Sequence, residues 1–600
     1  MRTLLAWLED RSGIGACVRD WLQRPMAGGV AWRHVWPTTL AFTFLVQAMT
    51  GLVLWIYYSP SSQTAWESVY NIQCNVAWGW LVRGIHHYAG QVMLVLVGLY
   101  FLQMLIRGAY RAPRELLFWT VVLLALITVA LNLTGDLLPW DQNSYWATHV
   151  RVGFLHMLPL GDRLFELAAG GPEFSHLTST RFLTLHVGVF SVAFAGLLAL
   201  HGWLARRHGM EPSLEWHAQP YWPRQALRDS IACLAVLFVV LVLAFWHCTG
   251  DATQWGAGLG APANPAEGFQ AARPEWSFRG LFQFRSLLPP KAEILAIFVI
   301  PGCLVLLVFA MPWIGKSQAG HIANIGFILF VLVGLACLSY RSYKNDANDE
   351  GYQKALVDGN RQAQRVIELA SSPQQIPREG ALAILPRDPK TQGPVLFHKQ
   401  CASCHDYADG QDTIARKEPP KAPDLYRFAS REWLKGFLDP KGIASPEYFG
   451  NTKFKSGKMA RFLKENWENF EPKDVEAACA ALSAEAGLPA QREMDREDAA
   501  QISEGRKGIA KDMGCGDCHK FREKTSGASE TPSLTGYGSR EWLIGIINDA
   551  GHRRFYGKAN DGMPVYADSS TEPANHVMSA RDIGVLADWL RGDWYEVEEE

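Results

Sequence analysis

Two short motifs in the C-terminal half of the 600-residue chain combine two cysteines and a histidine at the same spacing. CASCH contains Cys401, Cys404 and His405, and CGDCH contains Cys515, Cys518 and His519. Two cysteines at this spacing can bond to the two vinyl groups of one haem, and the adjoining histidine can supply the first iron ligand. A zinc site would need four ligands close together, and a redox-active C-x-x-C pair would need no histidine there. The motifs therefore predict two covalent c-type haems.

The sequence around the motifs is repeated. SREWLKG (430–436) is similar to SREWLIG (539–545), and YFG (448–450) is similar to FYG (555–557). APDL and TPSL stand at the same distance ahead of the two SREWL segments. These echoes predict two copies of one small helical domain, at 391–490 and 495–600.

Each haem needs a second axial ligand, and a methionine thioether is one that raises the reduction potential. Met563 in GMP is the candidate in the second copy. Met459 in SGKMARF lies at the matching place after YFG in the first copy. Methionine is more often a core residue, but the position within the repeat favours ligation. We therefore expect each copy to supply its own methionine.

The N-terminal half is dominated by long apolar runs with few charges, each long enough to cross a bilayer as a helix of about 20 residues. The runs are 38–58, 80–106, 115–135, 181–205, 228–248, 291–313 and 320–340. The expected fold is all-α, a seven-helix transmembrane bundle followed by two small helical cytochrome c domains. Residues 1–36 form an N-terminal segment whose first 24 residues are predicted to be an amphipathic surface helix, and 343–390 form a linker.

Charge gives the expected orientation. Lys and Arg number 57 against 59 Asp and Glu, a balance that argues against a nucleic-acid partner. Loop 59–79 has no Lys or Arg, whereas the loops on the other side contain Arg107, Arg111, Arg114, Arg206, Arg207, Arg224 and Arg228. The positive-inside rule then places the C-terminal domains in the periplasm, with the spans in a bacterial inner membrane.

Histidines within the apolar runs are candidate iron ligands, because an ionisable side chain in a membrane helix is costly. His86 lies on the second run, and His186 and His201 lie on the fourth. Two helices that each present a histidine at one depth can bind a haem iron from both sides. The 15-residue spacing puts His186 and His201 on one face at depths roughly 22 Å apart. The fourth helix is therefore suited to two stacked haems.

The membrane half resembles cytochrome b of the quinol-oxidising cytochrome bc complexes, most closely the chloroplast and cyanobacterial form. The similar segments are TFLVQAMTGLVLWIYYSP (43–60), APRELLFW (112–119), TGDLLPWDQNSYWA (134–147), STRFLTLH (179–186) and PEWS (274–277). Residues 37–210 resemble the four-helix cytochrome b domain. Residues 211–342 resemble the three-helix subunit that is separate in that family.

The resemblance implies a complete outer haem b site. His86 and His186 match the iron ligands, and Arg83 matches a propionate partner. Gly51 and Gly135 match the glycines that let the ring edge approach the helix backbone.

The positions that match the inner haem site are altered. His201 matches one ligand, but Tyr100 stands in place of the other, and Pro37 and Val121 replace the glycines. Val35 stands where the chloroplast form has the cysteine for an extra haem. We therefore expect one haem b, at the outer site. Because tyrosine can ligate haem iron, a second haem held by Tyr100 and His201 is the alternative.

PEWS implies a quinol pocket that contains Pro274, Glu275 and Trp276, with LPWDQ (138–142) as another wall. Glu275 matches the family's glutamate that takes a quinol proton, a general-base role that suits a carboxylate near the membrane face. Ser277 stands where family members usually have tyrosine.

The expected function is that of a membrane quinol:cytochrome c oxidoreductase subunit that oxidises quinol at the periplasmic face. Electrons would pass to the two c haems without a complete Q cycle. The expected partners are a Rieske-type iron–sulfur subunit, a soluble or membrane cytochrome c acceptor and other subunits of a dimeric complex. The alternative is a non-catalytic electron-transfer or anchoring subunit of a larger respiratory complex, with a vestigial quinol pocket.

Overall fold

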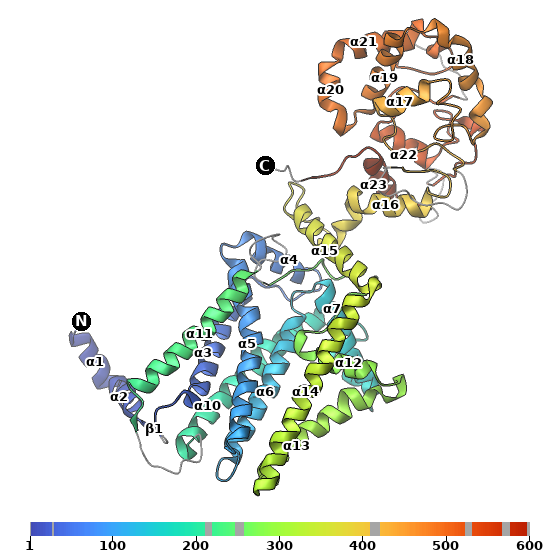
Figure 1. The fold of residues 1–600 in the computed structure, drawn as a ribbon. Helices are drawn as coiled ribbons and strands as arrows, with labels where there is room; N and C mark the ends of the chain where they lie inside the picture. Colours follow the sequence, from blue (N-terminus) through green and yellow to red (C-terminus); the bar gives the residue numbers. More distant parts are fainter. Residues whose placement is uncertain are drawn as a thin grey trace. The chain divides into compact units, whose positions relative to one another are not determined.

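The computed structural model describes residues 2–26, 29–209, 219–246, 257–408, 420–522, 531–566 and 577–596. These residues are almost entirely helical, and the strands among them are the two-residue antiparallel pair β1 (Pro25–Met26) and β2 (Gln219–Pro220). The chain divides into two compact units, Met1–Leu382 and Ala383–Glu600 (Figure 1). The predicted all-α fold is confirmed.

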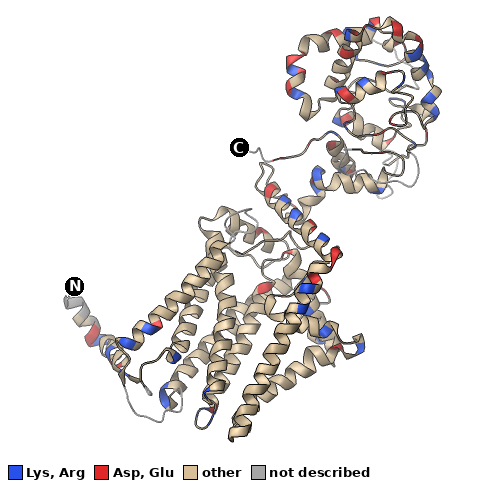
Figure 2. Cartoon of the chain, viewed as in Figure 1, with Lys and Arg blue, Asp and Glu red and all other residues tan. Residues whose placement is uncertain are grey.

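Among the described residues of the first unit, seven helical segments are long and apolar enough to cross a membrane, as predicted. They are α3 (Trp36–Tyr57), α5 (Gly79–Ile106), α6 (Glu115–Asp136), the segment His176–His208, α11 (Arg224–Trp246), the segment Pro290–Ile314 and α14 (Gln318–Asn348). Figure 2 shows few charged residues along these helices, with charges gathered near their ends. The chain is therefore a multi-pass membrane protein.

Two of these segments contain π-helical turns. His176–His208 consists of α9 (His176–Leu183), η4 (Thr184–Phe190) and α10 (Ser191–His208), and η4 is π-helical. Pro290–Ile314 consists of η7 (Pro290–Ala292), the π-helical η8 (Leu295–Val299) and α13 (Ile300–Ile314). π-helical turns are rare in proteins, and those that occur often lie at functional sites. His186 lies within η4.

The core of the bundle lies between α3, α5, α6, α10 and α11. Helix α5 packs against α3, α6 and α11, and α10 packs against α6 (Figure 1). Met93, Val97, Phe118, Leu124 and Phe194 are buried there. Large apolar side chains such as Leu52, Phe238 and Phe330 are exposed on the outer faces, as expected for a protein surrounded by lipid.

Short helices fill the connections of the first unit. They are η1 (Trp32–His34), α4 (Ala65–Tyr70), η2 (Asn71–Asn75), α7 (Gln142–Gly153), η3 (Phe154–Met157), α8 (Gly161–Ala169), η6 (Trp276–Phe278) and α12 (Arg279–Ser286). Asp141 caps α7, because its Oδ1 accepts a hydrogen bond from the Ser144 N–H and its own N–H donates to Ser144 Oγ. This capping box fixes the start of the LPWDQ–α7 connection.

The N-terminal surface helix is divided. The sequence predicts one amphipathic helix over residues 1–24, whereas the structure has α1 (Arg2–Ser12) and α2 (Ile14–Gln23). Gly13 separates them with φ of 62°, a left-handed conformation that glycine adopts without a steric penalty.

Part of the predicted linker packs on the first unit. After α14, Asp349 caps α15 (Glu350–Ala370) by accepting from the Tyr352 N–H. The hydroxyl groups of Tyr70 and Ser371 are 2.8 Å apart, and Glu67 accepts from the Ala381 N–H at 3.0 Å. The predicted boundary at 210/211 lies outside the described residues, and the six-part division remains a prediction.

The second unit contains only helices and loops among its described residues. They are η9 (Ala381–Ala383, at its start), η10 (Leu385–Arg387), α16 (Pro389–Gln400), α17 (Arg431–Leu438), η11 (Lys453–Ser456), α18 (Lys458–Asn466), η12 (Trp467–Asn469), α19 (Pro472–Ala486), η13 (Pro489–Gln491), α20 (Arg492–Glu497), α21 (Ala499–Lys507), η14 (Gly508–Asp512), η15 (Cys515–Asp517), α22 (Arg540–Asn548), η16 (Gly557–Ala559) and α23 (Ala580–Leu590). The larger hydrophobic core of its described residues draws on side chains from Phe397 to Leu590, and a smaller one contains Ile443, Phe449 and Leu463.

The sequence repeat is also a repeat of local structure. Ser430 caps α17 and Ser539 caps α22 through the N–H of Trp433 and Trp542 respectively. Each tryptophan indole then donates at 2.9 Å to a backbone carbonyl of the preceding loop, that of Asp424 or of Ser533. The two copies therefore use the same side chains to hold the same turn.

Candidate functional site

His86 and His186 face one another inside the bundle. The α5 helix carries His86, the π-helical η4 segment carries His186, and the centres of the two imidazole rings are 6.2 Å apart. Ser191 Oγ donates to the His186 carbonyl at 2.7 Å and so satisfies a backbone acceptor in this irregular turn. The structure thus brings together the two predicted ligands of the outer haem.

Threonine hydroxyl groups determine which ring nitrogen of each histidine carries the proton. The Thr50 hydroxyl donates to the Val46 carbonyl and lies 3.0 Å from His86 Nδ1. The Thr134 hydroxyl donates to the Ala130 carbonyl and lies 3.1 Å from His186 Nδ1. Because each hydroxyl has already donated its proton, Nδ1–H of each imidazole is the donor. Both lone pairs are then at Nε2, the arrangement that a metal-binding imidazole needs.

Gly51 and Gly135 make room for these rings. A Cβ atom at Gly51 would lie 3.0 Å from His86 Cε1, and one at Gly135 would lie 2.8 Å from His186 Cε1. Both distances are tighter than ordinary van der Waals contact. The predicted glycine pair is therefore required by the histidines themselves in this structure.

The residues of the outer site fit an iron held by two imidazoles. Two metal–imidazole bonds of about 2 Å each, extended to the ring centres, span roughly 6 Å, and the observed separation is 6.2 Å. In this structure Arg83 is buried and donates to Gln73 Oε1 at 2.9 Å and to the carbonyl groups of Ala257 and Gly258. Its predicted contact with a propionate remains a prediction.

The predicted inner site contains a closed hydrogen-bond chain. The Thr120 hydroxyl donates to the Leu117 carbonyl and lies 2.8 Å from His201 Nδ1, so Nδ1–H is again the donor. His201 Nε2 then accepts from the Tyr100 hydroxyl at 2.8 Å. Tyr100 and His201 are each 1% exposed, and Val121 is fully buried in the same core. The lone pair that would bind iron is therefore used by Tyr100, and these residues as arranged do not fit a haem.

PEWS and LPWDQ line one cavity of about 810 Å³. The residues that line it include Asp141 and Gln142 of LPWDQ and Pro274, Glu275 and Trp276 of PEWS. Loop 257–263 is joined to LPWDQ, since Gly260 N–H donates to Asp141 Oδ2 and Gln142 N–H donates to the Ala261 carbonyl. The two segments that the sequence predicts as pocket walls are thus brought together.

Glu275 is the titratable group of this cavity whose pKa is shifted furthest toward neutrality. Burial raises the pKa of Glu275 to about 7, and the negative charge of Asp136 acts in the same direction. The Arg151 guanidinium, which forms an ion pair with Asp136, opposes the shift. A carboxyl group with a pKa near neutral pH can accept a proton and release it again under ordinary conditions.

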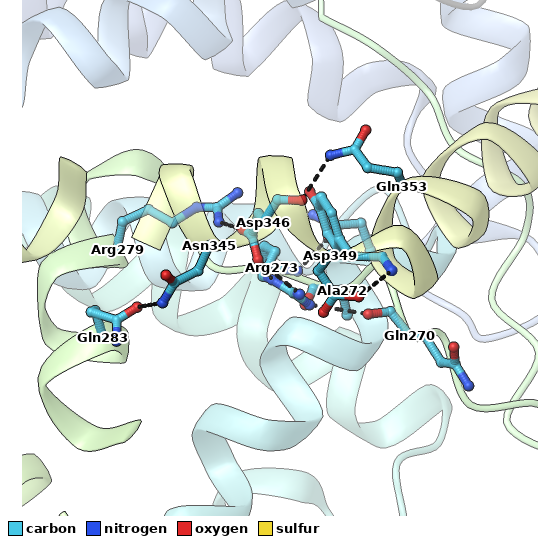
Figure 3. A network of polar contacts seen from close by, with 11 residues as sticks. Gln270, Ala272, Arg273, Arg279, Gln283, Asn345, Asp346, Asp349 and Gln353 are labelled. Carbon is cyan, nitrogen blue, oxygen red and sulfur yellow. Dashed lines mark hydrogen bonds and ion pairs between the residues drawn. The ribbon is translucent and has the colours of Figure 1, made fainter. Parts of the chain in front are cut away.

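A polar network holds the PEWS segment in place (Figure 3). Arg273 and Arg279, on either side of PEWS, both form ion pairs with Asp346 of α14, and Arg273 Nε lies 3.0 Å from Asp346 Oδ1. Gln353 of α15 donates to the Asp346 carbonyl at 2.8 Å. Trp276 Nε1 donates to Gln91 Oε1 on α5 at 2.7 Å. Glu275 is therefore fixed between anchored residues on both sides.

The two C-x-x-C-H motifs have matching surroundings. His405 Nδ1 lies 2.8 Å from the Pro423 carbonyl, and His519 Nδ1 lies 2.8 Å from the Pro532 carbonyl. A carbonyl only accepts, so each histidine carries its proton on Nδ1 and presents Nε2 for ligation. Burial raises the pKa of the Cys401 thiol to about 12 and that of Cys515 to about 11. The donor set at each motif fits a covalently attached haem.

A largely apolar cavity of about 540 Å³ adjoins the second motif, and its lining differs from the prediction. Cys515, Cys518 and His519 line it together with Met459 of the first copy. The sequence assigned Met459 to His405 because both belong to the first copy. The structure instead places Met459 with His519, and Met563 is not among the residues that line this cavity.

Sequence reasoning missed the groups that orient the predicted ligands. Thr50 and Thr134 each precede a predicted glycine, so the repeated Thr-Gly pair is a signal that could have identified them. Asp136 and Arg151 had no such signal, because their ion pair joins the end of α6 to α7.

The membrane half matches known proteins. Residues 91–253 match the family model described as "Cytochrome b(N-terminal)/b6/petB". Cytochrome b6 of Synechococcus elongatus is 34% identical over 215 residues, which cover 36% of this chain and 100% of that protein. The menaquinol:cytochrome c reductase cytochrome b subunit of Bacillus subtilis is 38% identical over 217 residues, 35% of this chain and 97% of that protein.

A third relative is itself longer than its matched region. Cytochrome b/c1 of Bradyrhizobium diazoefficiens is 27% identical over 325 residues, which cover 52% of this chain. The chain spans 46% of that relative's length.

Replacing Thr50 or Thr134 with valine should weaken b haem retention by up to about 10- to 100-fold, because the histidine loses a hydroxyl acceptor of its Nδ1–H. The smaller effect is expected at Thr134, since His186 keeps the Leu131 carbonyl, 3.0 Å from its Nδ1. The measurement is the b haem content of the purified chain during detergent dilution. Thr128→Val is the matched control, since Thr128 is buried on α6 and its hydroxyl donates to the Leu124 carbonyl. Equal retention in Thr134→Val and Thr128→Val would contradict the assigned role.

Proposed function

The chain belongs to the cytochrome b/b6 family, and on that premise we propose that it is a quinol:cytochrome c oxidoreductase subunit. It oxidises quinol at the periplasmic face of a bacterial inner membrane and passes electrons to two covalent c haems. The family implies haem b, which His86 and His186 would hold. The name of the relative from Bacillus subtilis, a menaquinol:cytochrome c reductase cytochrome b subunit, supports this class of reaction.

The observation that carries the proposal is Glu275 in the cavity between PEWS and LPWDQ. The cavity volume, about 810 Å³, lies within the range of small-molecule sites. Its lining combines aromatic side chains with a carboxyl group whose pKa is about 7. A quinol headgroup is a flat ring with two hydroxyl groups, so it requires both features.

The chemistry of the site divides between the protein and the haems. When bound, the haems accept and donate single electrons. The Glu275 carboxylate accepts the proton as a quinol O–H bond breaks. The ion pairs of Asp346 with Arg273 and Arg279 keep the PEWS backbone in place during this transfer. Burial is the main cause of the raised pKa of Glu275, and the adjoining charges of Asp136 and Arg151 raise and lower it respectively.

The arrangement of the inner site supports the proposal that this chain holds one haem b, at the outer site. His201 is buried and uses both ring nitrogens, toward Thr120 and Tyr100. With no haem there, electrons would lack the usual route toward the cytoplasmic face, and the chain would not complete a Q cycle. All electrons from quinol would then leave on the periplasmic side.

The partners follow from what the chain does not encode. Both cysteine pairs of the sequence belong to C-x-x-C-H motifs, and the sequence contains no motif for an iron–sulfur cluster. We therefore include a Rieske-type subunit as the first electron acceptor and a soluble or membrane cytochrome c as the final one, within a dimeric complex.

Glu275→Gln should lower quinol-dependent reduction of the c haems by roughly 10²- to 10⁴-fold, since general-base catalysis contributes that much. In the native protein the rate should rise with pH up to about 7, as Glu275 loses its proton, and then level off. The variant should lose this pH dependence. Stopped-flow reduction of the c haems by a decyl quinol measures both effects.

Glu267→Gln is the matched control, because Glu267 is an exposed residue of the loop that precedes PEWS. It should keep the native rate and pH profile. An unchanged rate in Glu275→Gln would contradict catalysis at this cavity. That outcome would favour the alternative of an electron-transfer or anchoring subunit with a vestigial pocket.

A further inference from the structure

We propose that the two c-haem sites are assembled crosswise from the two sequence copies. Each haem keeps the histidine of its own C-x-x-C-H motif and takes its methionine from the other copy. Met459 then serves the haem of Cys515, Cys518 and His519, and Met563 serves the haem of Cys401, Cys404 and His405. The inference rests on the proposed covalent haems and specifies how their sites are built.

The cavity at the second motif carries the first half of the proposal. His519 and Met459 line the same apolar space of about 540 Å³, although 60 residues separate them in the chain and they belong to different copies. Phe462, Trp467 and Phe470 of the first copy also line this cavity. The wall of the second motif's cavity that carries Met459 is thus built by the first copy.

Helix packing shows the same exchange. The helix that leads into the first motif, α16, packs against α23, the last helix of the second copy (Figure 1). The helix that leads toward the second motif, α21, packs against α19, the last helix of the first copy. A Cβ atom at Gly393 would lie 2.1 Å from Trp589, and one at Gly505 would lie 1.9 Å from the Ala477 carbonyl oxygen. The backbone of Gly393 thus lies against the Trp589 side chain, and that of Gly505 lies against the backbone of Ala477, each contact joining the two copies.

Buried polar groups fasten the end of α19 to the second copy. The Glu485 side chain, 6% exposed, forms ion pairs with Arg506 and Arg522 and accepts from the Gly536 N–H at 3.1 Å. Arg591, just after α23, donates to the carbonyl groups of Ala486 and Gly487. A buried carboxylate left without these partners would be costly, so these contacts select the crossed arrangement.

Contacts between the second copy and the first motif support the second half of the proposal, in which Met563 serves the haem of the first motif. Tyr566, three residues after Met563, donates from its hydroxyl to the Gln400 carbonyl next to Cys401 at 2.7 Å. The Tyr407 ring, two residues after His405, stacks on Trp589 of α23 with 4.2 Å between ring centres. Lys453 Nζ donates to the Asn560 carbonyl at 2.9 Å, which ties together the two loops that precede the methionines.

The test assigns each methionine to a haem in the full-length chain. Cys404→Ala leaves one thioether at the first motif, and the vinyl group that remains conjugated moves that haem's α-band to longer wavelength. The label lets a spectroelectrochemical titration follow the two c haems separately. Met459→His and Met563→His are then introduced one at a time, because replacing thioether by imidazole lowers the reduction potential.

Crossed ligation predicts that Met459→His lowers the potential of the unlabelled haem and that Met563→His lowers that of the labelled one. The opposite assignment, or an effect of both variants on one haem, would overturn the proposal. The reciprocal label, Cys518→Ala, should exchange the two results and replaces Cys404→Ala if that variant fails to fold.

Two further methionine variants serve as controls. Met494 is exposed, and Met494→His should leave both potentials unchanged. Met513 lines the same cavity as Met459, and Met513→Leu should keep the methionine–iron charge-transfer absorption of both haems; loss of that band would overturn the role of Met459. Absence of covalent haem in the native chain would refute the proposed function itself, whereas covalent haems with uncrossed methionines would refute only this inference.

Discussion

The proposed haem sites depend on histidines whose Nδ1–H group already donates a hydrogen bond within the protein. At His86, His186 and His201 a threonine hydroxyl that donates to its own helix accepts this proton, and at His405 and His519 a proline carbonyl does so. In every case the lone pair lies at Nε2. At His201 the Nε2 lone pair accepts a hydrogen bond from the Tyr100 hydroxyl, whereas His86 and His186 turn their rings toward one another, with 6.2 Å between the ring centres. This one hydrogen bond distinguishes the inner site, at His201, from the outer haem site, at His86 and His186.

The membrane spans could be predicted from the sequence because lipid requires long apolar helices with internally satisfied backbones. The fourth span was predicted at 181–205, and the structure extends it to His176–His208 with a π-helical turn at His186. Such a turn inserts a residue without changing the apolar composition, so the hydropathy pattern does not reveal it. The histidine pair itself followed from residue type and spacing.

Tertiary partners could not be predicted in the same way. The repeat showed that two copies of one structure exist, and the matching caps at Ser430 and Ser539 agree with it. A repeat does not show which copy packs against which, because both arrangements bury the same side chains. That Met459 lines the same cavity as His519 could therefore be learned only from the structure. The Asp136–Arg151 pair beside Glu275 joins two elements and likewise left no local pattern.

The central claim is that the His86–His186 pair binds haem, whereas His201 at the inner site is hydrogen-bonded to Tyr100 and does not. Haem stoichiometry of the purified full-length chain tests this most directly, since acidic acetone extracts haem b and leaves covalent haem c on the protein. The account predicts two covalent haems for each extractable one. A ratio of two to two would show that His201 also binds haem and would contradict the account.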